Sequence, residues 1–175
     1  MIEFTVFGVA QPKGSAKAFL PKGWTRPIVT SDNPKNRGWQ QLVAEGASRA
    51  LAQQPSAALL EGAVRLVVVF YLPRPKKYQT RRYDGQAVAH LTKPDLDKLV
   101  RSVKDALTRV VWHDDSQVIE LIARKFYATG DDAPHAEIRV EPAFIPKTAR
   151  EDGAGATIAN SPDPQHPLFP SETRF

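Results

Sequence analysis

A nine-residue apolar run at positions 64–72, VRLVVVFYL, limits the possible folds more than any other segment. It is rich in valine, whose branched side chain suits a strand, and Pro73 ends it. Because polar residues are nearly absent from it, the run predicts a strand over Ala63–Leu72 that is buried on both faces. A helix that crosses a bilayer needs about 20 apolar residues, so we expect no membrane segment.

Periodic patterns on both sides of this run predict further strands and two helices. Alternation of apolar and polar residues predicts a first strand over Glu3–Val9. Apolar residues spaced three and four apart predict one helix from Pro34 to about Gln53 and a second that ends near Val110. Strands at Val118–Tyr127 and Ala136–Val140 flank a turn with a glycine and two aspartates, which is typical of a hairpin.

Residues at the predicted helix starts suit capping. Asp32 or Asn33 precedes the first helix, and Thr92 precedes the second, with Pro94 in its first turn. The residues from Ser15 to Pro34 follow no clear period, so we expect a long ordered loop there.

Together these elements predict a mixed α/β (α+β) domain over residues 1–142. Its small mixed sheet has about four strands and carries two main helices. Residues 143–175 are rich in proline and lose the apolar pattern, so we expect a disordered tail. A length of 175 residues suits one domain.

Cysteine is absent, which excludes disulfides, cysteine-ligated zinc and a redox dithiol and fits a reducing compartment. The first residues, MIEFTVFGV, have no basic region and no cleavage site of a secretory signal. We therefore expect a cytoplasmic protein.

The net charge of +5 and pI of about 9.6 suggest a polyanionic partner. The excess is concentrated between Pro73 and Lys93, where six basic residues face one acid, Asp84. We expect this segment to contact nucleic acid through Arg74, Lys76, Lys77, Arg81, Arg82 and Lys93. A second candidate is the loop after the first strand, where Lys13, Ser15 and Lys17 suit a phosphate-binding nest.

Four carboxylates follow a pattern that suits a hard cation. Asp95 and Asp97 lie at the start of the second helix, and Asp114 and Asp115 follow about one helix length later. Carboxylates without histidine or cysteine suit Mg²⁺. A structural interpretation remains open beside this one, because acids also cap helices, favour their first turn and form turns.

Three motifs carry a resemblance to a known family: KPDLDKL at 93–99, DAL at 105–107 and WHDDSQV at 112–118. In this order and spacing they resemble the RusA family of Holliday junction resolvases, whose pattern is roughly (K/R)xDLDNLxK, DAL and DDxQV. The resemblance implies a RusA-like fold and a homodimeric endonuclease that depends on Mg²⁺, or Mn²⁺, and cuts two opposed strands of a four-way DNA junction. The PKGS loop at 12–15 is similar to that of phage-type members, which suggests a phage or prophage gene in a bacterial cell.

The resemblance also assigns roles to individual residues. It makes Asp95, Asp97 and Asp115 the catalytic metal ligands, and we add Asp114 as an accessory ligand. The family's lysine falls on Arg101, which stays protonated and so can stabilise charge but cannot act as a base. The family's asparagine is Lys98 here, which we expect to contact phosphate.

Other interpretations stay open at this stage. The chain could be a non-catalytic DNA-binding protein of the same fold, or a nuclease that cuts flaps or forks. His90 and His113 flank the acidic motifs and are weaker candidates for a metal or phosphate contact, whereas Trp112 is predicted to be a core residue.

Overall fold

The computed structural model describes residues 1–31, 33–55, 58–83, 85–129 and 132–144, with only the backbone of 16–17, 29–31 and 81. The chain divides into two units, Met1–Phe144 and Ile145–Phe175, and the second lies outside the described residues. The disordered tail at 143–175 and the domain boundary at 142 therefore stay predictions.

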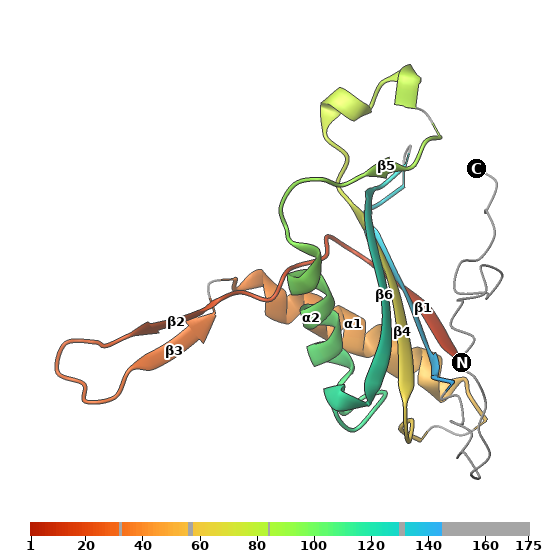
Figure 1. Cartoon of the computed structure of the whole chain (residues 1–175). Coiled ribbons are helices and arrows are strands. Elements are labelled where there is room, and N and C mark those ends of the chain that lie inside the picture. The colour runs from red at the N-terminus through yellow and green to blue at the C-terminus, as the bar shows by residue number, and fades with distance from the viewer. Residues whose placement is uncertain (32, 56–57, 84, 130–131, 145–175) are drawn as a thin grey trace, which may run out of the picture. The chain divides into compact units, whose positions relative to one another are not determined.

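A five-stranded mixed sheet forms one layer of the first unit, and two helices form the other (Figure 1). The strand order is β1-β7-β4-β6-β5. The strands are β1 (Ile2–Phe7), β4 (Val64–Leu72), β5 (Val88–Ala89), β6 (Val118–Tyr127) and β7 (His135–Pro142), and the helices are α1 (Lys35–Ala52) and α2 (Leu96–Leu107). The mixed α+β class with two main helices is thus confirmed, with one short strand more than the expected four.

The central strand β4 is covered on one face only. Its buried side chains alternate with half-buried ones, so that Leu66, Val68 and Phe70 point into the core while Val67 and Val69 lie on the opposite face. The prediction of burial on both faces was wrong for this second face, because both helices pack on the same side of the sheet. The core between the layers joins β4 to apolar residues of α1 and α2.

The chain from β4 through α2 to β6 is a crossover between two parallel neighbours. β4 pairs in parallel with β6, with Leu66 opposite Leu121, and a parallel pair needs such a connection. β7 pairs antiparallel with the other edge of β4. The predicted hairpin of β6 with β7 was therefore wrong, since β4 lies between these two strands.

Pro34 occupies the N-cap of α1 without a side-chain capping hydrogen bond, so the cap predicted at Asn33 was wrong, as was the cap predicted at Thr92 for α2. The Asn33 side-chain oxygen accepts a hydrogen bond from the Lys35 backbone at 3.2 Å, while Asp32 lies outside the described residues. In α2, Asp95 and not Thr92 is the residue that precedes the first turn. Lys125 Nζ of β6 donates to the carbonyls of Thr92 and Pro94, both at 2.8 Å, which holds this segment on the sheet edge and outside the helix.

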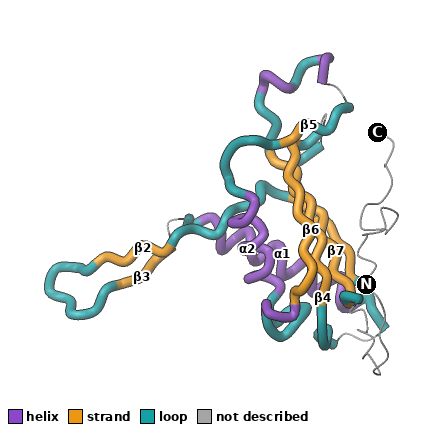
Figure 2. The backbone as a smooth tube through the Cα atoms, in the orientation of Figure 1, coloured by secondary structure: helices purple, strands orange, loops and turns teal. Residues whose placement is uncertain are grey.

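The predicted loop at 15–34 contains a hairpin. β2 (Ala16–Phe19) and β3 (Ile28–Ser31) pair antiparallel as a separate two-stranded sheet. This hairpin extends away from the helices and the larger sheet (Figure 2). We call residues 16–31 the β2–β3 arm.

In the described part of the chain, no helix has the length and apolar character needed to span a membrane.

Candidate active site

A groove between α2 and β6 brings together two of the predicted catalytic aspartates. It has a volume of about 460 Å³ and is lined by Asp97, Arg101 and Lys104 of α2 together with Asp115. The three α2 residues are four and three positions apart, so they share one face of the helix. Leu121 and Ala123 of β6 add an apolar wall. The groove thus contains two carboxylates and two cations.

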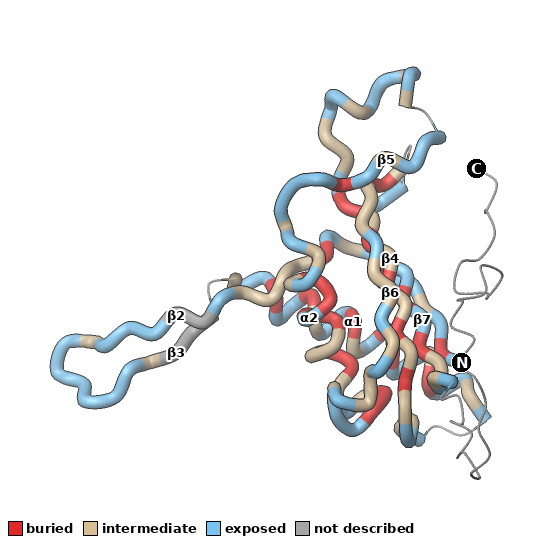
Figure 3. Tube along the Cα trace, in the orientation of Figure 1, coloured by how far each residue is buried: buried red, intermediate tan, exposed pale blue. Residues whose placement is uncertain are grey.

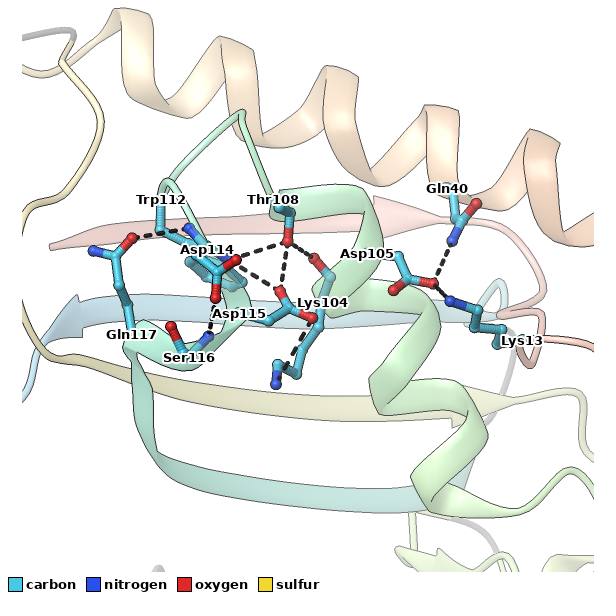
Figure 4. Close-up of polar contacts among 10 residues, drawn as sticks. All are labelled: Lys13, Gln40, Lys104, Asp105, Thr108, Trp112, Asp114, Asp115, Ser116 and Gln117. Carbon is cyan, nitrogen blue, oxygen red and sulfur yellow. Dashed lines mark hydrogen bonds and ion pairs between the residues drawn. The ribbon is translucent and has the colours of Figure 1, made fainter.

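Asp115 is held in one orientation by groups at the end of α2 (Figure 4). Its Oδ1 lies 2.5 Å from the Thr108 hydroxyl and accepts a hydrogen bond from Trp112 Nε1 at 3.2 Å. Its Oδ2 lies 3.8 Å from Lys104 Nζ. Trp112 is fully buried, which confirms its predicted core position, and its rigid ring fixes the carboxylate. Oδ1 of Asp115 is thus held by two neutral donors, while Oδ2 lies beside the ammonium group of Lys104.

Asp95 lies away from this groove. Its carboxylate is 3.3 Å from Lys98 Nζ, and both residues line a different cavity, of about 460 Å³, with Lys93 and His90. Asp95 precedes Leu96, and Lys104 is eight residues further along α2, which is about 12 Å at the rise of an α-helix.

Within the described residues, no group of three histidine, cysteine, aspartate or glutamate side chains could hold a metal. One chain therefore brings together Asp97 and Asp115 but does not add Asp95. The ligand set of Asp95, Asp97 and Asp115 stays a prediction.

Asp114 caps the 3-10 turn Asp115–Gln117. Its Oδ1 accepts a hydrogen bond from the Ser116 backbone at 2.8 Å, and the Gln117 side chain accepts one from the Asp114 backbone at 3.0 Å. The hydrogen bond from Ser116 lowers the pKa of Asp114, and the charges of Arg109 and Lys104 act in the same direction. The capping interpretation thus holds for Asp114, whose role as an accessory metal ligand stays a prediction.

Comparison with known proteins places these residues in a family. The sequence model of the family described as Endodeoxyribonuclease RusA matches residues 10–141. The chain belongs to the RusA family. It is also similar to the uncharacterized protein YqaN of Bacillus subtilis (strain 168), with 31% identity over 144 residues, which is 79% of this chain and 94% of YqaN. The RusA match includes the groove, the α2 start and the β2–β3 arm.

The N-terminal loop of this RusA-family chain packs against α2. Lys13 Nζ pairs with Asp105 Oδ2, and its backbone donates to the Lys98 carbonyl at 2.9 Å. Gln40 of α1 donates to the same Asp105 oxygen at 3.4 Å, as Figure 4 shows. Lys13 therefore joins the loop to the helix. Ser15 is exposed, and the side chain of Lys17 lies outside the described residues. Phosphate binding by this loop stays a prediction.

The basic segment after β4 divides into a structural arginine and exposed cations. Arg74 donates to the carbonyls of Tyr78, Tyr83 and Gln86 at 3.4, 3.0 and 2.6 Å, so it holds the loop together. Exposed cations remain available for DNA at Lys76, Lys77, Arg82 and Lys93, while the side chain of Arg81 lies outside the described residues. The structure thus gives Arg74 another role, and the DNA contacts of this segment stay predictions.

The two histidines differ in their surroundings. His113 is exposed and lies 2.9 Å from a carboxylate oxygen of Glu61. His90 is buried against the Tyr127 ring, with 4.5 Å between the ring centroids. Burial lowers the pKa of His90, and the charge of Lys125 lowers it further. His90 Nδ1 has no hydrogen-bond partner among the described residues.

Two residues that contact Asp115, Lys104 and Thr108, were not among the predicted site residues. Lys104 follows Asp97 by seven positions, so its helical spacing already places it on the same face as Asp97 and Arg101. Thr108 lies just after α2, and no pattern in the sequence connects it with Asp115.

Proposed function

We propose that this protein is an endonuclease that selects four-way DNA junctions and hydrolyses their phosphodiesters with the help of Mg²⁺ or Mn²⁺. The observation that supports this best is the groove of a RusA-family chain in which Asp97 and Asp115 lie with Arg101 and Lys104. A cytoplasmic location and a phage or prophage gene stay part of the proposal.

The donor set suits a hard divalent cation. Mg²⁺ binds through oxygen, commonly with one or two carboxylates together with the phosphates of the substrate. Asp97 and Asp115 supply such oxygens in one groove. When bound, the cation polarises the scissile phosphate and lowers the pKa of the attacking water.

The remaining groups of the groove bind and orient. Arg101 and Lys104 place two positive charges where negative charge develops on the phosphate oxygens. The guanidinium of Arg101 serves as an electrostatic stabiliser and not as a base. Thr108 and Trp112 keep the Asp115 carboxylate in one orientation before the substrate binds.

We propose that the active form is a homodimer that pairs through β6. On the side of β6 away from β4, β5 pairs only with Phe126 and Tyr127. Among the described strands, none covers residues 118–125 on that side. Ile119 and Leu121 of the same strand are about half exposed, at 55% and 49%. An open strand edge with exposed apolar residues is a template for pairing with another chain.

Antiparallel pairing of two β6 edges would complete the ligand set between subunits. Asp115 lies in the turn just before β6, whereas Lys125 near the end of β6 holds the segment just before Asp95. A two-fold axis puts the start of one strand beside the end of the other. Asp95 of one subunit then approaches the groove of the partner subunit, in which Asp97 and Asp115 already lie together. Two matched sites result, as paired cuts across a junction require.

Mixing two inactive variants tests both parts of the proposal. Asp95→Asn and Asp97→Asn are each expected to bind a synthetic four-way junction but not to cleave it when Mg²⁺ is added. Each variant removes one carboxylate that is needed for the cation. After mixing and subunit exchange, heterodimers retain one site with both aspartates, so nicking of one strand should return. Wild-type protein, linear duplex, a flap substrate and Mg²⁺-free buffer serve as controls.

Three outcomes would contradict parts of the proposal. Wild-type protein that binds the junction but fails to cleave it with any divalent cation is a non-catalytic DNA-binding protein. A preference for the flap identifies a different substrate. Inactive mixtures after verified subunit exchange mean that each site is built within one chain.

A further inference from the structure

The tip of the β2–β3 arm exposes large apolar side chains. Phe19, Leu20 and Trp24 are 52%, 60% and 59% exposed. The turn is closed by a hydrogen bond from the Trp24 backbone to the Pro21 carbonyl at 3.0 Å, and Gly23 supplies its positive φ of 88°. Figure 3 shows this outer part of the arm as mostly exposed. The tip is thus a formed turn and not an irregular end.

The charge of this region has one sign. From Ala10 to Ser31 the sequence contains no aspartate or glutamate. Lys22 and Arg26 lie two positions before and after Trp24, and both are exposed. A basic surface with an aromatic ring between its cations suits a polyanion that also offers flat rings, as DNA does. A protein partner would need an acidic patch to match the same surface.

Isolation of the arm supports a role outside the core. β2 and β3 pair only with each other among the described strands, and an isolated two-stranded sheet is at best marginally stable in water. Its exposed apolar residues add nothing to the core of the larger sheet. Proteins that open or bend DNA place such apolar side chains between base steps.

We infer that the tip of the β2–β3 arm is a DNA-binding wedge, in which Trp24 stacks on bases exposed at a branch point while Lys22 and Arg26 contact the flanking phosphates. This inference rests on the proposed function, because it takes branched DNA as the substrate. It assigns recognition of the branch point to a segment distinct from the groove. Bases at a branch point are less completely stacked than those of a continuous duplex, so they accept an added ring at lower cost.

Tryptophan fluorescence of the full chain tests the wedge directly. The chain has three tryptophans, of which Trp39 and Trp112 are buried at 3% and 0% exposure, so Trp24 is the residue that iodide can quench. We use the Asp97→Asn protein in Mg²⁺-free buffer to keep the DNA intact. A four-way junction is expected to quench Trp24 and to protect it from iodide, and a linear duplex of the same arm sequence is expected to do so much less.

Binding by tip variants completes the test. Trp24→Ala is expected to bind the junction roughly tenfold more weakly, since stacking on one base contributes about this much, with little change on linear duplex. Trp24→Phe keeps a ring and should retain most of the affinity. Leu42→Ala is the matched control, because Leu42 is an exposed apolar residue of α1 at 44%. Unchanged melting temperatures confirm that the variants fold.

The outcomes separate this inference from the proposed function. If the Asp97→Asn protein binds the junction while Trp24 stays open to iodide, the wedge is wrong and the endonuclease proposal stands. If the Asp97→Asn protein does not bind the junction, the wedge and the endonuclease proposal are both wrong. If Trp24 becomes protected as protein concentration rises without DNA, the tip contacts a second copy of the chain and the wedge is again wrong.

Discussion

The carboxylate of Asp115 is held in one orientation by its neighbours. The Thr108 hydroxyl and the Trp112 indole hold one oxygen, and Lys104 lies near the other. We predict that Thr108→Val, which keeps the shape but removes the hydroxyl, lowers junction cleavage about 10- to 100-fold, the usual cost of losing a group that orients a ligand. Single-turnover cleavage measures this, with junction affinity as the internal control. Equal losses of affinity and cleavage would assign Thr108 to DNA binding.

His90 gives the fold a pH dependence with a defined sign. Burial and the charge of Lys125 lower the pKa of His90 below the ordinary value of 6.5. As the pH falls below that value, the unfolded chain therefore binds a proton at His90 more readily than the folded chain does. Its contribution to the free energy of unfolding is complete above pH 6.5 and decreases as the pH falls below that value. Urea unfolding of wild type and His90→Gln between pH 5 and 8 measures the difference. Parallel curves for the two proteins would contradict the assignment.

Individual site residues were predictable to different degrees. The motif spacing grouped Asp97, Arg101 and Asp115, and the structure places these three in one groove. It also grouped Asp95 with them, although Asp95 faces Lys98 in a different cavity. A linear motif records order along the chain, but not the end of α2 at which each residue lies. Thr108 was unpredictable because its contact with Asp115 depends on the turn after the helix.

At the scale of elements, a buried polar contact joins α1 to α2. The Ser102 hydroxyl donates to the Asn36 side-chain oxygen at 2.5 Å, and both residues are buried. We predict that Ser102→Ala destabilises the protein by about 1–3 kcal/mol, because it leaves a buried acceptor without a donor. Urea unfolding checks the value. The double variant with Asn36→Leu should recover part of the loss, and additive losses in this cycle would mean that the two side chains do not interact.

Helices and strands with strong periodicity were predicted well, but the pairing of the strands in the sheet was not. The patterns of β1, β4, β6 and both helices are visible in the sequence. The choice of neighbours was missed because β6 and β7 each alternate in a way that suits any partner. The parallel pairing of β6 with β4 follows from the crossover through α2, and β7 occupies the other edge of β4 in an antiparallel pair. The β2–β3 arm was missed because its strands have only four residues each, too few to show a clear alternation.

At the scale of the whole molecule, the net charge of +5 should act through a particular surface. We predict that replacing Lys76, Lys77 and Arg82 by alanine lowers the log–log salt slope of DNA binding by about one for each phosphate that the protein no longer neutralises, and weakens junction and linear duplex alike. Binding titrations at salt concentrations from about 50 to 200 mM measure the slope. Alanine replacement of Lys35, Arg37 and Arg49 of α1, which removes the same charge, is the control. An equal change of slope in this control would show that the DNA contacts are not specific to the basic segment.

The unpaired edge of β6 bears on the distance between the two cleavage sites of a dimer. If two copies join there, the pair of cutting centres is separated by a stretch of hydrogen-bonded backbone, residues 118–125, which spans roughly 25 Å at the rise of a strand. Backbone of this kind resists stretching far better than a surface loop does. The spacing between the two nicks would then be a fixed property of the protein, and DNA would have to bend to fit it.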